Sequence, residues 1–348
     1  MNPIIKSIDS ETFETPLHRT FSTSQGSANV ARGVAIHLTL EDGRTVRGES
    51  VPVKYVTGET LESVIEVVNS VTPSLVGLSL ANYRQALRQI SIRAPHSPSA
   101  RCGLEMAILE AWSLENGMSI ARMLGGATNY AESDITISID KDAPELAKSA
   151  YDSGFKILKI KVGGGDLETE IQRVLNVVEA APEATLRIDA NQAFSREDAV
   201  AFATRLHAQG VKLQLLEQPV PKEDFEGMDY VAQRSPVPVF ADESCRSLQD
   251  ALRLVTQTQI SGLNLKINKC GLWNVLEIIS IAKAAGKKLM LGCMLETRRS
   301  IAASLEIVCG TGAFDYVDLD SHLLLNEPGI NEFFEQNGSE MKLKNFAP

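Results

Sequence analysis

Eight short apolar segments, repeated every 20 to 30 residues or so, constrain the fold of this chain more than any other feature. Amphipathic segments separate them, and this alternation is typical of a parallel sheet covered by helices. Eight strands favour a (β/α) barrel, and no GxGxxG follows the first strand to indicate a dinucleotide-binding fold. The predicted strands span residues 134–139, 156–162, 184–189, 213–217, 237–242, 263–267, 288–292 and 315–319.

The first 125 residues lack this alternation and predict a separate α+β domain. Residues 34–40 and 45–49 are expected to form a hairpin, because the Asp-Gly pair between them is a common hairpin turn. Two stretches with helical spacing of apolar residues follow, at 59–92 and 99–124. The segment 16–29 is rich in Ser, Thr and Gly, and we expect a loop there that is either plain surface or a lid.

The second predicted barrel strand carries two lysines on one face. Lys159 and Lys161 alternate with apolar residues that point the other way. Burying two ammonium groups side by side costs several kcal/mol unless carboxylates lie nearby. The alternative is an edge strand with two solvated lysines. The ends of the following strands bear on this choice.

Ionisable residues end four of the later strands at regular spacing. From Lys161, steps of 28, 28, 25 and 24 residues lead to Asp189, Glu217, Asp242 and Lys266. Each step is one strand–helix unit, so the five groups are expected at the C-terminal mouth of the barrel, where barrel enzymes have their active sites. A single strand-end Asp would more often cap a helix. Ionisable residues at the ends of several successive strands, one strand–helix unit apart, favour a functional site instead.

These residue types suit proton transfer next to a carboxylate. Three carboxylates from consecutive strands are hard ligands for Mg²⁺. Lys161 and Lys266 are expected on opposite sides of the mouth, where one could remove a proton and the other return one. Crowding and partial burial are expected to lower a lysine pKa. A divalent cation, with Lys159, would stabilise the resulting enediolate. The glycines at 163–165 lack a following GK[ST] and are interpreted as a flexible strand exit, not a phosphate loop.

In these motifs the chain resembles the enolase superfamily, specifically its muconate-lactonising subgroup. The resemblance implies an α/β fold: a modified (β/α)7β barrel over 126–321, an N-terminal α+β capping domain over 1–125, and a segment 322–348 that returns to the cap. The matching stretches are Lys-Ile-Lys (159–161), Asp-Ala-Asn-Gln (189–192), Glu-Gln-Pro (217–219), Ala-Asp-Glu-Ser (241–244), Asn-Leu-Lys (264–266) and Leu-Gly-Gly (124–126).

The last strand resembles that of one group within the subgroup, the dipeptide epimerases. Asp318 and Asp320 are similar to the Asp-x-Asp pair with which those enzymes hold the substrate ammonium. The alternative is an ordinary pair of strand-end carboxylates. The same resemblance implies that Thr136 and the backbone of Cys293 and Leu295 line the substrate.

Arginines elsewhere in the chain bear on the substrate side chain. Arg19 resembles the arginine that contacts an acidic second residue in Ala-Glu epimerases. Matching it requires a one-residue shift with His18, so another side-chain preference stays open. The adjacent Arg298 and Arg299 could serve instead, or be surface charge.

The resulting functional hypothesis is a Mg²⁺-dependent dipeptide epimerase that transfers a proton at the α-carbon of the C-terminal residue. The alternatives in the same superfamily are o-succinylbenzoate synthase and N-acylamino acid racemase, whose substrates have no free ammonium for the acidic pair. A non-catalytic barrel that binds an anion is a further alternative, although binding alone does not need a lysine on each side.

Charge and cysteine content predict the setting. A net charge of −10 disfavours nucleic-acid and membrane partners, because no basic face would meet phosphates. Five scattered cysteines without a CxxC pair or a secretory leader favour reduced thiols, hence a soluble cytoplasmic protein. A homo-oligomer stays open.

Overall fold

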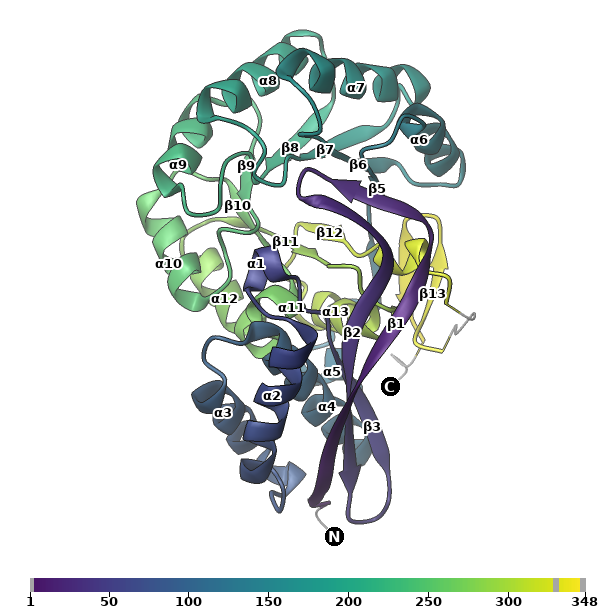
Figure 1. Ribbon diagram of the computed structural model, residues 1–348, viewed down its shortest axis with the longest axis vertical. Coiled ribbons are helices and arrows are strands. Elements are labelled where there is room, and N and C mark those ends of the chain that lie inside the picture. Colours follow the sequence, from purple (N-terminus) through teal and green to yellow (C-terminus); the bar gives the residue numbers. More distant parts are fainter. Residues whose placement is uncertain (1–2, 328–331, 345–348) are drawn as a thin grey trace.

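The computed structural model describes residues 3–327 and 332–344, and its centre is an eight-stranded parallel sheet curled into a barrel (Figure 1). The strands pair in sequence order, and each lies within one of the eight predicted segments, except that the sixth begins one residue earlier, at Gly262. The predicted fold class is therefore confirmed. The strands are β5 (Ile135–Ile137), β6 (Ile157–Lys161), β7 (Thr185–Asp189), β8 (Leu213–Glu217), β9 (Val239–Ala241), β10 (Gly262–Leu265), β11 (Lys288–Gly292) and β12 (Tyr316–Asp318).

Helices surround the barrel and cover the outer face of each strand (Figure 1). Leu158 and Ile160 of β6 point outward into this apolar layer and are fully buried. Lys159 and Lys161 point inward and are 1% and 6% exposed, so β6 is a buried strand and not an edge strand. The helices are α6 (Ala143–Asp152), α7 (Leu167–Ala180), α8 (Arg196–Ala208), α9 (Phe225–Arg234), α10 (Leu248–Gln257), α11 (Ile267–Cys270), α12 (Leu272–Ala284) and α13 (Arg298–Thr311).

The first and last barrel strands meet at a seam that side chains help to close. Asp134 N donates to Val317 O at 3.2 Å, a backbone hydrogen bond between the segments of β5 and β12. Ser133 Oγ accepts from the backbone of Leu319 at 2.8 Å. Asp320 Oδ2 accepts from Thr136 N at 2.5 Å. The seam therefore depends in part on a carboxylate at the barrel mouth.

The N-terminal domain packs an antiparallel sheet against helices. Its strands are β1 (Ile5–Thr23), β2 (Gly26–Leu40) and β3 (Thr45–Ser50), and its helices are α1 (Lys54–Thr57), α2 (Leu61–Val71), α3 (Tyr83–Arg93), α4 (Pro98–Asn116) and α5 (Ile120–Met123). The stretch 59–92, expected to be helical, is two helices, because a short 3₁₀ turn containing Pro73 ends α2. The stretch 99–124 is likewise divided at Gly117, whose φ is 58°.

The sheet and α4 approach each other most closely at two glycines. A Cβ added to Gly48 would lie 1.9 Å from the carbonyl oxygen of Gly103 and 2.9 Å from the amide nitrogen of Ala107. Because both contacts are with backbone atoms, relieving the clash would require the strand or α4 to move. We expect Gly48→Ala to lower the free energy of unfolding by about 1–3 kcal/mol, measured by urea denaturation. Glu41→Ala, an exposed change beside the same sheet, is the control and should stay within about 0.5 kcal/mol of wild type. Equal stability of the two variants would contradict the close contact.

Strands β1 and β2 form a long hairpin that leaves the N-terminal domain and reaches over the barrel mouth (Figure 1). The segment 16–29, expected to be a loop, is the far half of this hairpin. Its tip is held by hydrogen bonds from Ser24 Oγ and Gln25 Nε2 to the backbone oxygen of Asn191, at 2.9 and 2.8 Å. The segment therefore covers the site, as a lid would, but it is a paired β-structure.

The C-terminal part of the chain contacts this hairpin. After the 3₁₀ turn Ser321–Leu324, Leu325 bridges to Leu17 and Asn326 N donates to Pro16 O at 2.8 Å. Strands β13 (Phe334–Asn337), β14 (Glu340–Leu343) and β4 (Tyr130–Glu132) then form a small sheet. Residues 1–2, 328–331 and 345–348 of the predicted domains lie outside the described residues, and the boundaries at 125 and 321 stay a prediction. No helix in the described part of the chain is long and apolar enough to cross a bilayer.

Candidate active site

Three buried carboxylates meet at the mouth of the barrel. Asp189 and Glu217 are the last residues of β7 and β8, which the sheet register pairs with each other, and Asp242 follows β9. One ligand oxygen from each lies within 4.8 Å of the others, and all three side chains are buried. Asp189 does not cap the next helix, because Ser195 does. The helix-cap alternative therefore fails for this residue.

The two lysines predicted to transfer protons approach the triad from different strands. Lys161 Nζ lies 2.5 Å from Asp189 Oδ2, and Lys266 Nζ lies 2.8 Å from Asp242 Oδ2. Lys161 ends β6, whereas Lys266 follows β10, so Asp189, Glu217 and Asp242 come between them around the mouth. The structure thus brings together both lysines and all three predicted metal ligands.

Lys159 connects the triad to the last strand. Its Nζ lies 2.9 Å from Glu217 Oε2 and 3.1 Å from Asp189 Oδ2, and it donates to Asp318 Oδ2 at 2.7 Å. Burial favours the neutral amine, but these carboxylates outweigh burial and raise the pKa of Lys159 well above its usual range. Lys159 is therefore a fixed positive charge.

The expected lowering of a lysine pKa is not what the structure supports. For Lys266, burial again favours the neutral form, but Asp242 and the other carboxylates raise its pKa well above the usual value. The close pairing of Lys266 with Asp242, at 2.8 Å, outweighs the repulsion from the neighbouring ammonium group of Lys159. Conversely, burial and the neighbouring Asp189 raise the pKa of Glu217 to about 8.

A further lysine in the site was not predicted from the sequence. Lys269 is fully buried on the short α11, and its Nζ lies 2.6 Å from Asp242 Oδ1 and 2.8 Å from Asn264 O. Lys269 contacts one carboxylate oxygen of Asp242, and Lys266 contacts the other. The three-residue spacing from Lys266 was the only available signal.

Asp318 and Asp320, at the end of the last barrel strand, lie at the same mouth. Asp318 is paired with Lys159, whereas no lysine or arginine among the described residues lies within ion-pairing distance of Asp320. Burial and the neighbouring Asp318 raise the pKa of Asp320 to about 6. Asp320 Oδ1 faces Cys293 Sγ at 4.0 Å, and its other oxygen accepts from Thr136 N. Asp320 is therefore a buried carboxylate without a cation.

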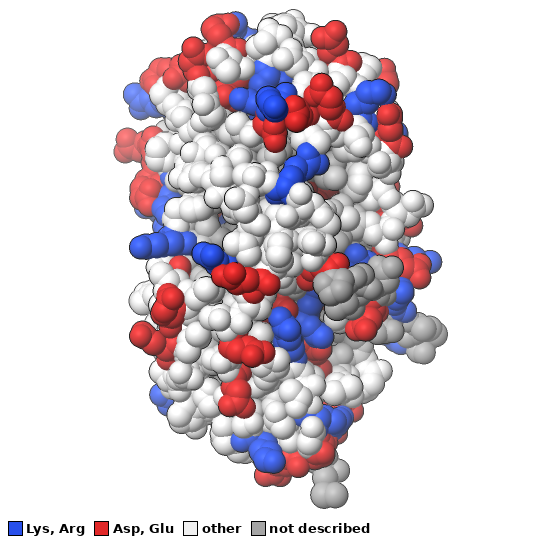
Figure 2. Space-filling model, turned by 45° about the vertical axis from the view of Figure 1, so that its right-hand side comes forward, with Lys and Arg blue, Asp and Glu red and all other residues white. Residues whose placement is uncertain are grey.

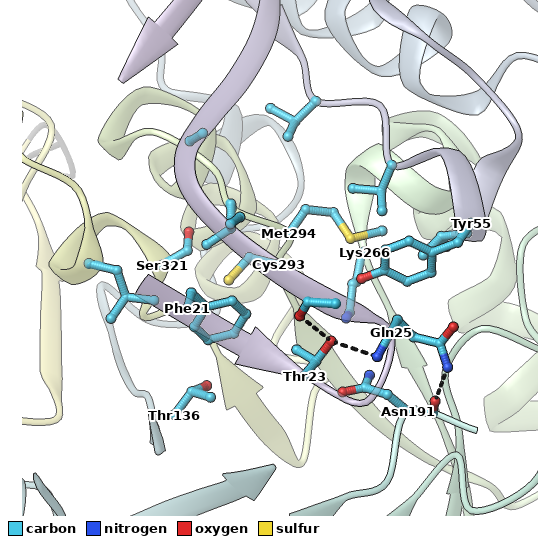
Figure 3. A pocket seen from close by; sticks show the side chains of 18 of the residues that line it. Phe21, Thr23, Gln25, Tyr55, Thr136, Asn191, Lys266, Cys293, Met294 and Ser321 are labelled. Carbon is cyan, nitrogen blue, oxygen red and sulfur yellow. Dashed lines mark hydrogen bonds between the residues drawn. The ribbon is translucent and has the colours of Figure 1, made fainter. Parts of the chain in front are cut away.

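One cavity of about 610 Å³ lies between the barrel mouth, the β1–β2 hairpin and the segment 51–56 (Figure 3), and its lining includes Asp242, Lys159, Lys161 and Lys266. Asp189 and Glu217 are not among the lining residues but contact Lys159 directly. Six of the predicted substrate residues line the cavity: Thr136, Lys159, Cys293, Leu295, Asp318 and Asp320. Arg19 is exposed on β1 and is not among the lining residues. Arg298 donates to Phe334 O and Arg299 pairs with Glu110, both outside the cavity.

Sequence reasoning missed the side chains that the N-terminal domain contributes. Phe21 and Gln25 come from the hairpin, and Tyr55 comes from α1 (Figure 3). No local pattern marks them, because their position depends on how the two domains pack. On the barrel side, Glu243 and Met294 also line the cavity and were not predicted.

Fold and site together define an α/β-barrel protein with a candidate divalent-metal site beneath a second domain. Residues 142–344 match the family model described as enolase C-terminal domain-like, and residues 7–125 match that of the mandelate racemase / muconate lactonizing enzyme N-terminal domain. The chain belongs to the mandelate racemase / muconate lactonizing enzyme family of the enolase superfamily.

Curated relatives and solved structures match the chain over nearly its whole length. It is 36% identical to the L-Ala-D/L-Glu epimerase of Thermotoga maritima over 334 residues, 95% of each chain. It is 33% identical to the aromatic dipeptide epimerase of Herpetosiphon aurantiacus, over 100% of this chain and 98% of the other. The structure of the Enterococcus faecalis dipeptide epimerase, complexed with Mg and L-Leu-L-Tyr, superposes with a TM-score of 0.93 at 30% identity, covering 98% and 97% of the two chains.

Proposed function

We propose that this protein is a Mg²⁺-dependent dipeptide epimerase that inverts the α-carbon of the C-terminal residue by 1,1-proton transfer. The observation that carries the proposal is the set of charged groups in one cavity and in direct contact with its lining. A carboxylate triad lies between Lys161 and Lys266, and an unpaired Asp320 lies at the same mouth. The relatives named above are epimerases of dipeptides, which supports the same reaction.

Asp189, Glu217 and Asp242 would hold the metal ion. Three carboxylates are the donor set that Mg²⁺ prefers. One oxygen of each carboxylate lies within 4.8 Å of the others, close enough for the three to bind one ion together, and Lys159 Nζ at 2.9 Å is the cation that pairs with Glu217 Oε2 in this arrangement. When bound, Mg²⁺ would offset the second negative charge that forms on the substrate carboxylate during deprotonation.

The lysines carry the proton transfer. Lys161 would remove the α-proton from one face of the carbon, and Lys266 would deliver a proton to the other face. The roles exchange in the reverse direction, as microscopic reversibility requires. Lys159, a fixed positive charge next to the triad, would add to the stabilisation of the enediolate.

Asp318 and Asp320 decide between this reaction and its closest alternatives. A free dipeptide has an ammonium group at one end and a carboxylate at the other, and Lys159 connects the triad to Asp318 of the acidic pair. A succinylbenzoate precursor or an N-acylamino acid has no cation to place there. Burying Asp320 without a partner would then be costly.

We expect Asp320→Asn to lower kcat/KM for a free dipeptide by roughly 10- to 100-fold, because a hydrogen bond to a charged group contributes about 1.5–3 kcal/mol. Mg²⁺ affinity, measured by calorimetry, should barely change. Asp315→Asn is the matched control, since Asp315 precedes the same strand and accepts from Leu289 N at its other end. An equal loss with an N-acetylated substrate would contradict the ammonium clamp.

The reaction itself can be tested without knowing the substrate. A library of free dipeptides and a parallel set of N-acyl and N-succinyl amino acids would be incubated in D₂O with the enzyme and Mg²⁺ and analysed by mass spectrometry. The proposal expects a mass increase of one deuterium in free dipeptides. Exchange confined to the N-acylated set would replace the epimerase with the racemase or synthase alternative.

We further propose that the protein acts in the cytoplasm without a nucleic-acid or membrane partner. Acidic and basic side chains are interspersed on the face shown in Figure 2, and they form no continuous basic area there. All five cysteines are free, as expected in a reducing compartment. A homo-oligomer is left open.

A further inference from the structure

The relatives do not determine which side chains the substrate carries. At 36%, 33% and 32% identity, they are named for L-Ala-D/L-Glu, aromatic and hydrophobic dipeptides, respectively. These identities are too similar to choose between an acidic and an apolar side chain. The walls of the cavity differ in the chemistry they offer, and they support a choice. The inference rests on the proposed function.

The ammonium end of the cavity has apolar walls. Cys293 and Thr136 mark this end, because both contact Asp320. Figure 3 shows the ring of Phe21 beside these two residues, at the end of the cavity where Ser321 also lies. Leu324 lines the cavity as well and is only partly buried. The side chain of the N-terminal residue would therefore lie against an aromatic ring.

The lysine end has a second apolar wall. Tyr55 and Met294 lie next to Lys266 in Figure 3, and both line the cavity. Tyr55 is 45% exposed, so its ring has surface still to be covered. The side chain of the C-terminal residue leaves an α-carbon placed between Lys161 and Lys266, and it would cover this surface.

Among the described residues that line the cavity, no buried cation is free to pair with an acidic side chain. The three buried lysines that line the cavity are each paired with a carboxylate: Lys159 with Asp318, Lys161 with Asp189 and Lys266 with Asp242.

The other cations that line the cavity are at its rim. Arg32 pairs with Glu14 at 2.8 Å, with both side chains about 60% exposed, and Lys54 is exposed on α1. Contacts with such solvated groups contribute little and are screened by salt.

The remaining charges in the cavity would repel a second carboxylate on the substrate. Glu243 lines the cavity and is buried, and its Oε2 accepts no hydrogen bond from any described residue. Asp318 and Asp320 add negative charge at the ammonium end. An acidic side chain would thus exchange water for apolar walls and like charge.

We infer that the substrates of this protein are dipeptides with two uncharged, apolar side chains, and that Phe21 contacts the side chain of the N-terminal residue. Phe21 is then a specificity-determining residue and has no part in the proton transfer. The acidic and basic dipeptides are the competing substrate classes.

The preferred class of substrate can be determined with two matched series of dipeptides, L-Ala-L-Xaa and L-Xaa-L-Ala, in which Xaa is Leu, Phe, Glu or Lys. We expect kcat/KM for deuterium exchange at the C-terminal α-carbon to be at least about tenfold higher for Leu and Phe than for Glu and Lys in both series. A Glu or Lys dipeptide that equals or exceeds them in either series would overturn the inference.

The role of Phe21 is tested by a ratio measured within each variant, so that the amount of folded enzyme cancels. Phe21→Ala should lower kcat/KM for L-Leu-L-Ala relative to L-Ala-L-Ala by about tenfold. Phe13→Ala removes a phenyl ring from the same strand, outside the cavity, and should leave the ratio unchanged. An unchanged ratio in Phe21→Ala, or an equal fall in Phe13→Ala, would contradict the contact.

The outcomes separate this inference from the proposed function. If free dipeptides exchange deuterium but those with acidic or basic side chains have the higher kcat/KM, the proposed epimerase activity is supported and the inferred apolar specificity is wrong. If no free dipeptide exchanges deuterium but N-acyl amino acids do, the proposed dipeptide epimerase function itself is wrong.

Discussion

Lys266→Ala is expected to stop epimerisation in both directions, by 10²- to 10⁴-fold or more, yet to leave exchange of one epimer intact. In the variant, Lys161 can still remove the α-proton that faces it, and the carbon then recovers deuterium on the same face. The epimer whose α-proton faces position 266 has no base to remove that proton in the variant, so its exchange should stop. Incubating each pure epimer in D₂O and following its α-proton by NMR measures both rates.

The buried carboxylate next to Lys266 does not lose its last partner in this variant. Lys269 Nζ stays 2.6 Å from Asp242 Oδ1, so an unpaired buried charge is avoided and the fold should hold. Lys161→Ala should show the mirror result, with exchange of the opposite epimer. Lys288→Ala, an exposed lysine at the start of β11, is the control. If both epimers exchange at wild-type rates in Lys266→Ala, two-base transfer is wrong.

Excess EDTA is expected to abolish activity of the wild type, and added Mg²⁺ to restore it, because the enediolate charge would otherwise be unbalanced. Glu217→Gln should weaken Mg²⁺ binding by at least 10- to 100-fold or so and lower activity in parallel. Gln keeps the shape of the side chain. Burial and Asp189 raise the pKa of Glu217 to about 8, so the protein without metal already favours a neutral side chain at this position. The metal-free thermal stability should therefore not fall.

Calorimetric titration with Mg²⁺ alone separates metal binding from catalysis. Glu105→Gln is the control for loss of a buried carboxylate, since Glu105 lies on α4, where it pairs with Arg101. That variant should lose stability but keep its Mg²⁺ affinity. Full activity of the wild type in excess EDTA would refute the metal assignment.

The barrel was predictable because its signals are local. Buried parallel strands are short apolar runs, and their regular spacing placed each strand-end residue at the same edge of the sheet. Asp189, Glu217 and Asp242 could be grouped on that basis alone, before any contact was known. The inward-facing lysines followed from strand alternation.

What the sequence did not reveal depends on contacts between distant segments. The hairpin tip around Ser24 has no alternating apolar pattern, because backbone pairing and the bonds to Asn191 hold it rather than a buried face. Phe21 and Tyr55 reach the cavity only through the packing of two domains. The direction of the Lys266 pKa shift likewise required distances to carboxylates. The break near Pro73, in contrast, has a local cause in the sequence, because a proline disfavours a continuous helix.

The seam between β5 and β12 has a consequence for how this protein can evolve. Asp320 Oδ2 accepts a hydrogen bond from the backbone amide of Thr136 across the seam, and Oδ1 faces Cys293 in the cavity. A change that adapts this position to another ligand therefore also changes how firmly the barrel is closed. Adaptation of recognition and adaptation to higher growth temperature are not independent at this residue, and selection for one constrains the other.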